Sequence, residues 1–489
     1  MSRLVLLLAS VLLCAPVVAG AQEAIDPRQA VARALERNPS LAAAVLARRS
    51  AGWAVVGEDA LFSPSLQVDA SATHNEAIQL SSVGSLLSSV DSVGAGAQID
   101  QRLRIGTDLT LRVEHDTVWN NSEDPLGAVT FGPFYDTSAR FELTQPLLRG
   151  AGAKVAEAAL RQARARETEA ERAAATTASQ LVRDVVTAWW ELWYAEEAVR
   201  IQRESLALAI AQRDDARRRV ETGTQAPVSV LTFETRVAEL EEGVASAEVT
   251  RRERALTLAA LLGDASTPVS AAEPALAPVQ APDPAQARAL AIEASPSVRE
   301  AEASRALAEV QAETAADPFR PRLDVQGFAE VGTLAPSFLS LGGGTRDDQL
   351  AWSAGVNLIF QMPLDGRQLR AAREQARLAV ESAQRRVEQA VLDASSQVES
   401  QLARLDAAIS RVDLAKRTVD VAERQLEAEK KRYAIGTATA IEVLEAEEAV
   451  RSARLRLARA EADLRGAAVA VEHLTGTLLA QWVPQELVR

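Results

Sequence analysis

The side chains that most often catalyse reactions or bind metals are few and widely spaced in this 489-residue chain. The three histidines, His74, His115 and His473, have no metal-ligand spacing. Cys14 is the one cysteine, so neither a disulfide framework nor a thiolate site is indicated. A phosphate loop is excluded at Gly150-x-Gly152-x-Lys154, because the spacing is wrong and the Ser or Thr is missing. The sequence therefore predicts no enzyme, no cofactor and no metal site.

Carboxylates are abundant, and four of them are closely spaced in a helical pattern: Glu442, Glu445, Glu447 and Glu448. Glu442 and Glu445 share one face of a helix, because they are three residues apart. Taken alone, this run is most simply a solvated helix face, and no pair of carboxylates indicates acid/base catalysis. The aromatic group at 189–194, Trp-Trp-x-x-Trp-Tyr, favours packing within a helical layer over a ligand platform.

Composition narrows the class of protein further. Lys and Arg number 53 against 67 Asp and Glu, which gives a net charge of −14 and argues against nucleic acid as a partner. Aromatic residues are only 4% of the chain, so long Ala/Leu/Val helical seams are favoured over large compact cores.

The first residues have the pattern of a secretory signal peptide. Arg3 precedes an apolar run at 4–19, and Ala19-Gly20-Ala21 supplies a small-x-small cleavage site, which predicts a signal peptide at 1–21. The alternative, an N-terminal membrane anchor, is disfavoured because the run is shorter than the ~20 residues of a membrane span. No later stretch has the ~18 uninterrupted apolar residues of a transmembrane helix.

An internal repeat organises the rest of the chain. Asp26-Pro27 and Asn38-Pro39-Ser40 recur, 257 residues later, as Asp283-Pro284 and Ser295-Pro296-Ser297. Gly-Thr turns at 223–224 and 436–437 correspond in the same order. This predicts two tandem structural repeats, residues 22–263 and 285–489, joined by a Pro-rich linker at 264–284.

The distance between matching blocks falls by about 40 residues partway through, so the first repeat contains an insertion. Alternating sequence at 94–104 and 107–117, with a turn at Ile105-Gly106, predicts an extra hairpin there. This hairpin either adds strands to a sheet or forms an outer lobe.

Each repeat also contains a very long helical pattern, at about 150–221 and 366–434, with no proline. Apolar residues recur every 3.5 residues on average, which predicts coiled-coil seams. Helical patterns resume at 228–262 and 441–474, so each Gly-Thr turn is expected to join an antiparallel hairpin. Some seam positions are polar: Gln202, Lys416, Glu423, Lys430 and Tyr433.

The strand-like segments alternate apolar and polar residues, as at 66–73, 109–114 and 323–328. In a secreted chain this pattern is typical of outer-membrane strands, and the alternative is a surface sheet of a periplasmic domain. Residues 81–93 and 342–344 are predicted to be loops. Because so few strands cannot close a barrel alone, several copies of the chain are expected to share one.

These motifs together resemble the TolC-like outer-membrane efflux protein family. The paired helix breaks at 38–40 and 295–297, the strand exit Thr144–Gly150, and the turn Arg432–Thr437 followed by Glu442-Val443-Leu444 carry the resemblance. It implies a mixed α and β fold, in which an outer-membrane β-barrel shared by a homotrimer continues as a long periplasmic α-helical coiled-coil barrel. It also implies docking to a periplasmic adaptor and an inner-membrane transporter for export across the outer membrane. The alternative function is a soluble periplasmic coiled-coil adaptor or scaffold.

The resemblance also implies roles for residues at the helix turns. Glu442 and Glu445, with Tyr433, match the periplasmic entrance gate of the family. Two expected partners of the gate are absent, because Ser229 and Ala438 replace an acidic and a basic residue. The lock of the closed entrance is therefore expected to be built otherwise, for example with Arg432 or Lys431. The positions that match adaptor-contacting turns are Thr222, Gly223, Thr224, Ile435, Gly436 and Thr437.

Overall fold

The computed structural model describes residues 23–81, 84–124, 127–222, 227–264, 269–274, 276–335 and 349–483. The predicted signal peptide, with Cys14, lies outside these residues. The chain divides into two compact units. The helical unit takes its described residues from 1–45, 174–299 and 390–489, and the sheet unit comprises 46–173 and 300–389.

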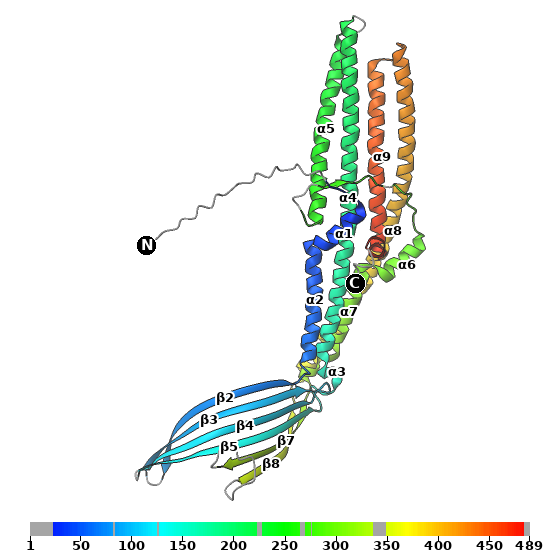
Figure 1. The fold of residues 1–489 in the computed structure, drawn as a ribbon. Coiled ribbons are helices and arrows are strands. Elements are labelled where there is room, and N and C mark those ends of the chain that lie inside the picture. Colours follow the sequence, from blue (N-terminus) through cyan, green and yellow to red (C-terminus); the bar gives the residue numbers. More distant parts are fainter. Residues whose placement is uncertain are drawn as a thin grey trace, which may run out of the picture. The chain divides into compact units, whose positions relative to one another are not determined.

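The sheet unit is built on one antiparallel sheet of six strands in the order β2-β3-β4-β5-β7-β8 (Figure 1). Among the described residues, β2 and β8 are the edge strands and lack a second neighbour. The strands are β2 (Ser65–Ser81), β3 (Gly84–Arg102), β4 (Asp108–Asp124), β5 (Gly127–Pro146), β7 (Arg322–Ala335) and β8 (Gln349–Gln361).

The predicted insertion adds two strands to this sheet rather than an outer lobe. Its hairpin is β3 and β4, which pair with each other and with β2 and β5 on either side. The loop predicted at 81–93 is wrong, because β2 continues to Ser81 and β3 begins at Gly84. The serines of this segment suggested a loop, but a continuous ladder to β2 pairs their backbone groups, which makes a strand stable there. The loop predicted at 342–344 lies outside the described residues.

The two faces of the sheet differ in chemistry, because successive residues of a strand point to opposite faces. One face carries large apolar side chains that are exposed in the single chain, including Leu66, Val68, Ile99, Leu111, Val113, Phe141, Val331, Trp352, Val356, Leu358 and Phe360. The other face carries ion pairs between strands, such as Arg112 of β4 with Asp69 of β2 and Arg140 of β5 with Glu330 of β7. This division confirms the alternation expected from the sequence.

The sheet unit also holds short elements next to the strands. Gly150 and Gly152 both have positive φ angles, +81° and +86°, so the chain cannot begin a helix at Gly150 as predicted. The helix α3 (Ala153–Ala156) comes first, and a break at Glu157 precedes the long helix α4 (Ala158–Glu221). The 3₁₀ helix η1 (Asp317–Phe319) precedes β7.

Long helices dominate the rest of the chain (Figure 1). The second predicted long helix is confirmed as α8 (Arg367–Ala434). The helices that follow the two turns are α5 (Val228–Leu261) and α9 (Ala440–Leu474). The shorter helices are α1 (Pro27–Arg37), α2 (Pro39–Ala60), α6 (Pro284–Ala294), α7 (Pro296–Thr314) and α10 (Leu478–Trp482).

The halves of the chain begin with matching local structure. In each, an aspartate N-cap, Asp26 or Asp283, accepts a hydrogen bond from the backbone N–H three residues later. The helix that follows has 11 residues and ends before a proline, Pro39 or Pro296. Within the predicted linker, β6 (Val269–Ala271) pairs in parallel with β1 (Glu23–Ile25).

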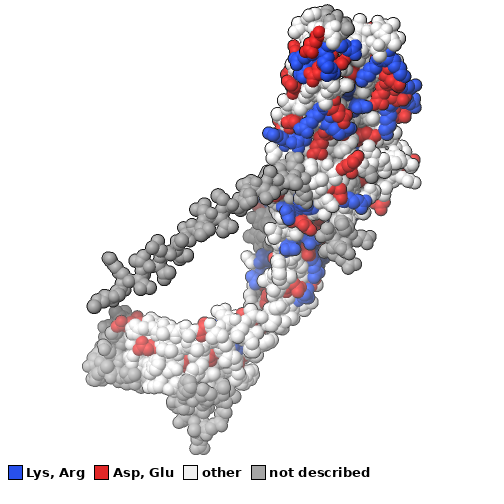
Figure 2. Space-filling view, turned by 45° about the horizontal axis from the view of Figure 1, so that its top comes forward, with Lys and Arg blue, Asp and Glu red and all other residues white. Residues whose placement is uncertain are grey.

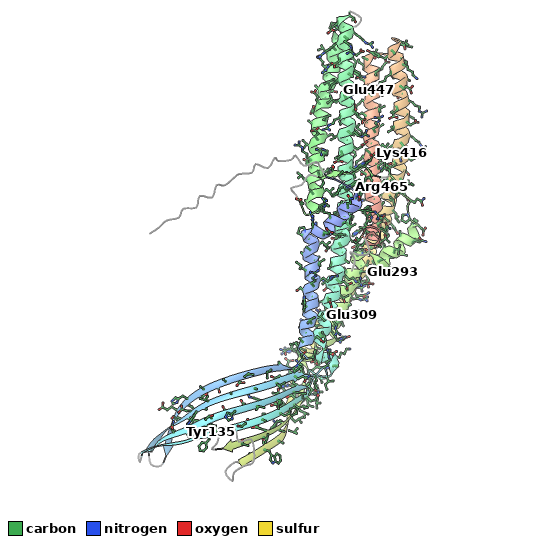
Figure 3. All side chains as sticks on the ribbon, in the orientation of Figure 1. Tyr135, Glu293, Glu309, Lys416, Glu447 and Arg465 are labelled. Carbon is green, nitrogen blue, oxygen red and sulfur yellow. The ribbon has the colours of Figure 1, made fainter. Side chains whose placement is uncertain are left out.

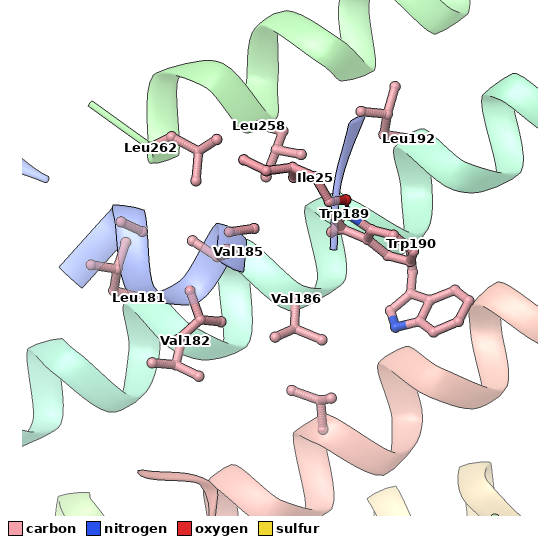
Figure 4. Close-up of a cluster of buried hydrophobic side chains, with 14 of the residues drawn as sticks. Ile25, Leu181, Val182, Val185, Val186, Trp189, Trp190, Leu192, Leu258 and Leu262 are labelled. Atoms are coloured by element: carbon pink, nitrogen blue, oxygen red, sulfur yellow. Dashed lines mark hydrogen bonds between the residues drawn. The ribbon is translucent and has the colours of Figure 1, made fainter. Parts of the chain in front are cut away.

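The helical unit has a core in which Trp189 is fully buried (Figure 4). Its indole N–H donates to the carbonyl oxygen of Ile25 over 2.7 Å. The ring of Trp190 packs edge-on against it, with centroids 4.9 Å apart. The tryptophans at 189–190 are therefore packing residues, as the sequence indicated.

Candidate functional site

The turn between α8 and α9 is held by local hydrogen bonds. Gly436 has φ +78°, a conformation that favours glycine, and its N–H donates to the carbonyl of Tyr433. The backbone N–H of Thr437 donates to the carbonyl of Arg432, and the Arg432 guanidinium donates to the carbonyl of Thr437. Ile435 is 75% exposed at this turn. The turn therefore presents an apolar side chain on a fixed backbone.

Glu442 begins α9 as part of a capping box. Its N–H donates to the hydroxyl of Thr439, the N-cap, and its carboxylate accepts from the Thr439 backbone N–H over 2.5 Å. These bonds from the backbone and the hydroxyl of Thr439 lower the pKa of Glu442, so the carboxylate stays charged near neutral pH. Glu445, one turn further on, is exposed.

The next two glutamates of this run, Glu447 and Glu448, do not form a solvated face. They contact side chains of other helices. Glu447 accepts a hydrogen bond from Gln212 of α4 at 2.7 Å and pairs with Lys430 of α8 at 3.2 Å (Figure 3). Glu448 pairs with Arg236 of α5 and with Arg451 of its own helix. Burial alone would raise the pKa of Glu448, but the two guanidinium groups lower it.

Tyr433 contacts the first helical hairpin through its ring. The guanidinium carbon of Arg219, near the end of α4, lies 5.8 Å from the ring centroid. A cavity of about 280 Å³ lies beside this contact, lined by residues of all four long helices, among them Gln212, Phe233, Tyr433 and Val443.

Lys431 and Arg432 are engaged within their own hairpin. Lys431 pairs with Glu427 one turn earlier, and Arg432 pairs with Glu429. Contacts between the two hairpins of one chain near the turns include those of Gln212, Arg219 and Arg236, which sequence reasoning missed. In the single chain Lys431 and Arg432 thus form ion pairs within the second hairpin, and their part in a lock of the entrance stays a prediction.

The sequence contained a signal for contacts between helices, namely the polar residues at positions of the coiled-coil seams. Gln202 accepts from Arg451 at 3.1 Å, and Glu423 accepts from Arg454 at 2.6 Å. Lys416 pairs at 3.0 Å with Glu461, which is almost fully buried. Each of these polar seam residues thus faces a polar or charged partner on another helix. A polar residue at a seam position therefore indicates a contact that fixes the register between two helices.

The turn of the first hairpin is described only in part. Thr222 is exposed, and its hydroxyl donates to the carbonyls of Arg218 and Arg219 at 3.1 Å. Gly223 and Thr224 lie outside the described residues, as does the side chain of Ser229.

In the described part of the chain, no group of three or more His, Cys, Asp or Glu side chains could hold a metal ion. Each histidine there has another partner: His74 contacts Asp91, His115 contacts Thr137, and His473 contacts Ser179. None of the helices in the described ranges combines the length and apolarity needed to cross a membrane.

Charge is distributed unevenly over the molecule. In Figure 2, blue and red side chains cover the long helices, whereas the visible face of the sheet is mostly white. The apolar face of the sheet, with its many exposed large side chains, is typical of a surface that contacts another protein or a membrane.

Comparison with known proteins shows which proteins this chain is similar to. Residues 287–477 match the family of the outer membrane efflux protein. No curated protein sequence matches the chain. The fold is similar to that of the Campylobacter jejuni CmeC outer membrane channel, with 14% identity, coverage of 92% of this chain and 86% of that one, and a TM-score of 0.66.

Two further solved structures have a similar fold. VceC, an outer membrane protein of Vibrio cholerae, is 17% identical, with coverage of 92% and 96% and a TM-score of 0.65. The open Neisseria gonorrhoeae MtrE outer membrane channel is 21% identical, with coverage of 92% and 89% and a TM-score of 0.63. At these identities the structures establish the fold.

The family match covers residues 287–477 and the fold match covers nearly the whole chain, so the chain is similar to outer-membrane efflux channels in the second half of its sequence and in its fold. The resemblance to the TolC-like outer-membrane efflux family is confirmed, with the sequence match in the second half of the chain and the fold match over nearly all of it.

Proposed function

We propose that this chain forms the outer-membrane duct of a tripartite export system and works as a homotrimer. The observation that carries the proposal is the six-stranded sheet, which has one face of exposed apolar side chains and two edge strands. An open strand edge cannot face lipid, because its backbone groups would lack hydrogen-bond partners. Several copies must therefore complete one β-barrel, which the long helices would continue as an α-helical coiled-coil barrel in the periplasm.

The proposed chain organisation is a signal peptide at 1–21 and two tandem repeats, 22–263 and 285–489, around the linker 264–284. The matching Asp caps and 11-residue helices near the start of each repeat support it. N-terminal sequencing of the exported protein should begin at Gln22, and a first residue within 1–21 would move the cleavage site.

Glu442 and Glu445 are proposed to form the periplasmic entrance gate. In a trimer they would supply two rings of three carboxylates, an arrangement that selects cations. The capping box supports this role, because it holds the Glu442 carboxylate in one position and keeps it ionised. Tyr433, in contact with Arg219, would hold the second hairpin against the first.

The helix turns are proposed to contact a periplasmic adaptor, which links the duct to an inner-membrane transporter. The contacting residues would be Thr222, Gly223, Thr224, Ile435, Gly436 and Thr437. The exposed Ile435 on its fixed turn supports an apolar contact of this kind. A photo-crosslinker attached through Thr437→Cys should capture the adaptor, and capture at the same level from an exposed helix position such as Glu241→Cys would contradict the assignment.

The membrane assignment is tested by fractionation. The protein should appear in the outer-membrane fraction as an oligomer that converts to monomer when heated in detergent. Recovery of the protein wholly in the soluble periplasm would overturn the duct and favour a soluble adaptor or scaffold.

The gate is tested by ion selectivity in planar bilayers. Glu442→Gln with Glu445→Gln removes two charges per chain, and glutamine preserves the capping box. We expect the double variant to lose cation selectivity. The control, Glu241→Gln with Glu242→Gln, removes two charges from the exposed face of α5 and should leave selectivity unchanged. Equal selectivity in both variants would remove the gate assignment.

A further inference from the structure

The two edge strands of the sheet are suited to pair with each other in neighbouring copies. All five strand pairs are antiparallel, so β2 and β8 run in opposite directions. When β8 of one copy lies beside β2 of the next, the pair is again antiparallel. The polar and apolar faces then continue from one copy to the next.

The register within the sheet gives the stagger of that junction. A row of directly opposite residues starts at Leu66 of β2 and passes through Ile99, Leu111, Phe141 and Ala329 to Ala354 of β8. β2 begins one residue before this row, at Ser65, whereas β8 ends seven residues beyond it, at Gln361. The first residue of β2 and the last residue of β8 lie on the same rim of the sheet. Along this rim, the strand ends are displaced by about six residues over the five steps from β2 to β8.

One further step, to β2 of the next copy, brings the shift to about seven residues per copy. The side-chain period of two allows only an even shift, which leaves six or eight. From a rise of ~3.3 Å per residue and a strand spacing of ~4.8 Å, these shifts give tilts of about 35° or about 42°. Transmembrane barrels have tilts of ~35–45°, so the single-chain sheet already carries the stagger of a closed barrel.

We infer that three copies close an 18-stranded barrel, with Leu66 of one copy opposite Phe360 or Met362 of the next. This inference rests on the proposed homotrimer and adds the strand count and the register of its junctions. An 18-stranded barrel of this tilt is roughly 35 Å across between backbones. Three chains without β3 and β4 would make a 12-stranded barrel roughly 24 Å across. The inserted hairpin therefore widens the outer pore about twofold in cross-sectional area.

Cysteine pairs across the junction test the register in the full chain. Asn357 of β8 lies on the polar face, and the two registers place it opposite Asp69 or Ser71 of the next β2. Asn357→Cys combined with one of Asp69→Cys or Ser71→Cys should give disulfide-linked dimers and trimers, and nothing larger, under oxidation. The control combines Asn357→Cys with Ala70→Cys, which points to the opposite face, and should give no disulfide-linked species.

The outcomes distinguish a failure of the proposed strand junction from a failure of the proposed duct. If the variants are heat-modifiable oligomers in the outer membrane but neither polar-face pair cross-links, the proposed junction is wrong and the duct stands. If the protein is absent from the outer membrane, the proposed function fails first. Covalent species larger than a trimer would overturn the 18-stranded closure.

Pore width supplies a second measurement. Deletion of residues 84–124 removes β3 and β4 and leaves β2 beside β5, as β7 lies beside β8. Poly(ethylene glycol) chains added on the outer side should enter the full-length pore at larger sizes than the pore of the deletion variant. An equal size limit in two channels that both conduct would contradict the wider barrel.

Discussion

The six-stranded sheet and the long helices distribute apolar and charged side chains in opposite ways. In the sheet, Val356 and Trp352 are about three-quarters exposed, whereas ion pairs such as Arg140 with Glu330 line the other face. In the helical unit, Val185 and Trp189 are fully buried, and charged side chains cover the face seen in Figure 2. The proposed duct accounts for this difference, because it places hydrocarbon outside the sheet and water outside the helices.

The largest expected effect comes from a charge on the apolar face of the sheet. Val356→Arg should abolish the outer-membrane oligomer, because an arginine facing lipid costs ~2–4 kcal/mol near the midplane and an oligomer carries several copies of it. The neighbouring substitution Asn357→Arg places the same charge on the polar face. The yield of heat-modifiable oligomer measures both. If the two variants lose oligomer equally, the apolar face does not contact lipid.

The core of the helical unit provides the next largest effect. Trp189→Ala should lower the free energy of unfolding by ~3–5 kcal/mol, because it leaves a cavity and an unpaired carbonyl at Ile25. Trp189→Phe removes the indole donor but keeps most of the volume, so its cost should be ~1–3 kcal/mol. Thermal unfolding followed by helical circular dichroism distinguishes them, and equal losses would show that the hydrogen bond dominates the packing.

The regular elements were the most predictable part of this fold. The second long helix was expected at 366–434 and is observed at Arg367–Ala434, because an uninterrupted apolar period over so many residues specifies a helix by local physics. The start of β3 was missed, because its serines break the alternation and its stability comes from pairing with β2 and β4. Tertiary pairing of this kind leaves little trace in a single strand.

The candidate site was less predictable. The seam indicated that Lys430 and Tyr433 face another helix, but it did not indicate Glu447 or Arg219 as their partners. Such partners are more than ten residues away in sequence, and in the case of Arg219 more than two hundred. They depend on the register between helices, which repeats along a seam of similar alanines and leucines.

His473 offers a test that uses pH. Burial, with a contribution from Arg183, lowers its pKa to about 4 from an ordinary value near 6.5. Between these values the unfolded chain binds a proton that the folded chain does not, so stability falls as the pH falls from 6.5 to 4. Because the ring is only partly buried, we expect this loss to be on the order of 2 kcal/mol. His473→Gln should lose correspondingly less between pH 7 and 4, and an unchanged difference between the two pH values would assign the effect to other groups.

The smallest expected effect lies where the two helical hairpins meet in water. The contact between the Arg219 guanidinium and the Tyr433 ring is partly exposed, so its loss in Tyr433→Leu should cost only ~0.5–1 kcal/mol. Tyr433→Phe keeps the ring and should behave as the wild type in stability. If the contact also holds the proposed entrance closed, Tyr433→Leu should raise the fraction of time that single channels spend open, and Tyr433→Phe should not. A rise in both variants would assign the effect to the phenol hydroxyl rather than to the ring, and no rise in either would confine this contact to folding.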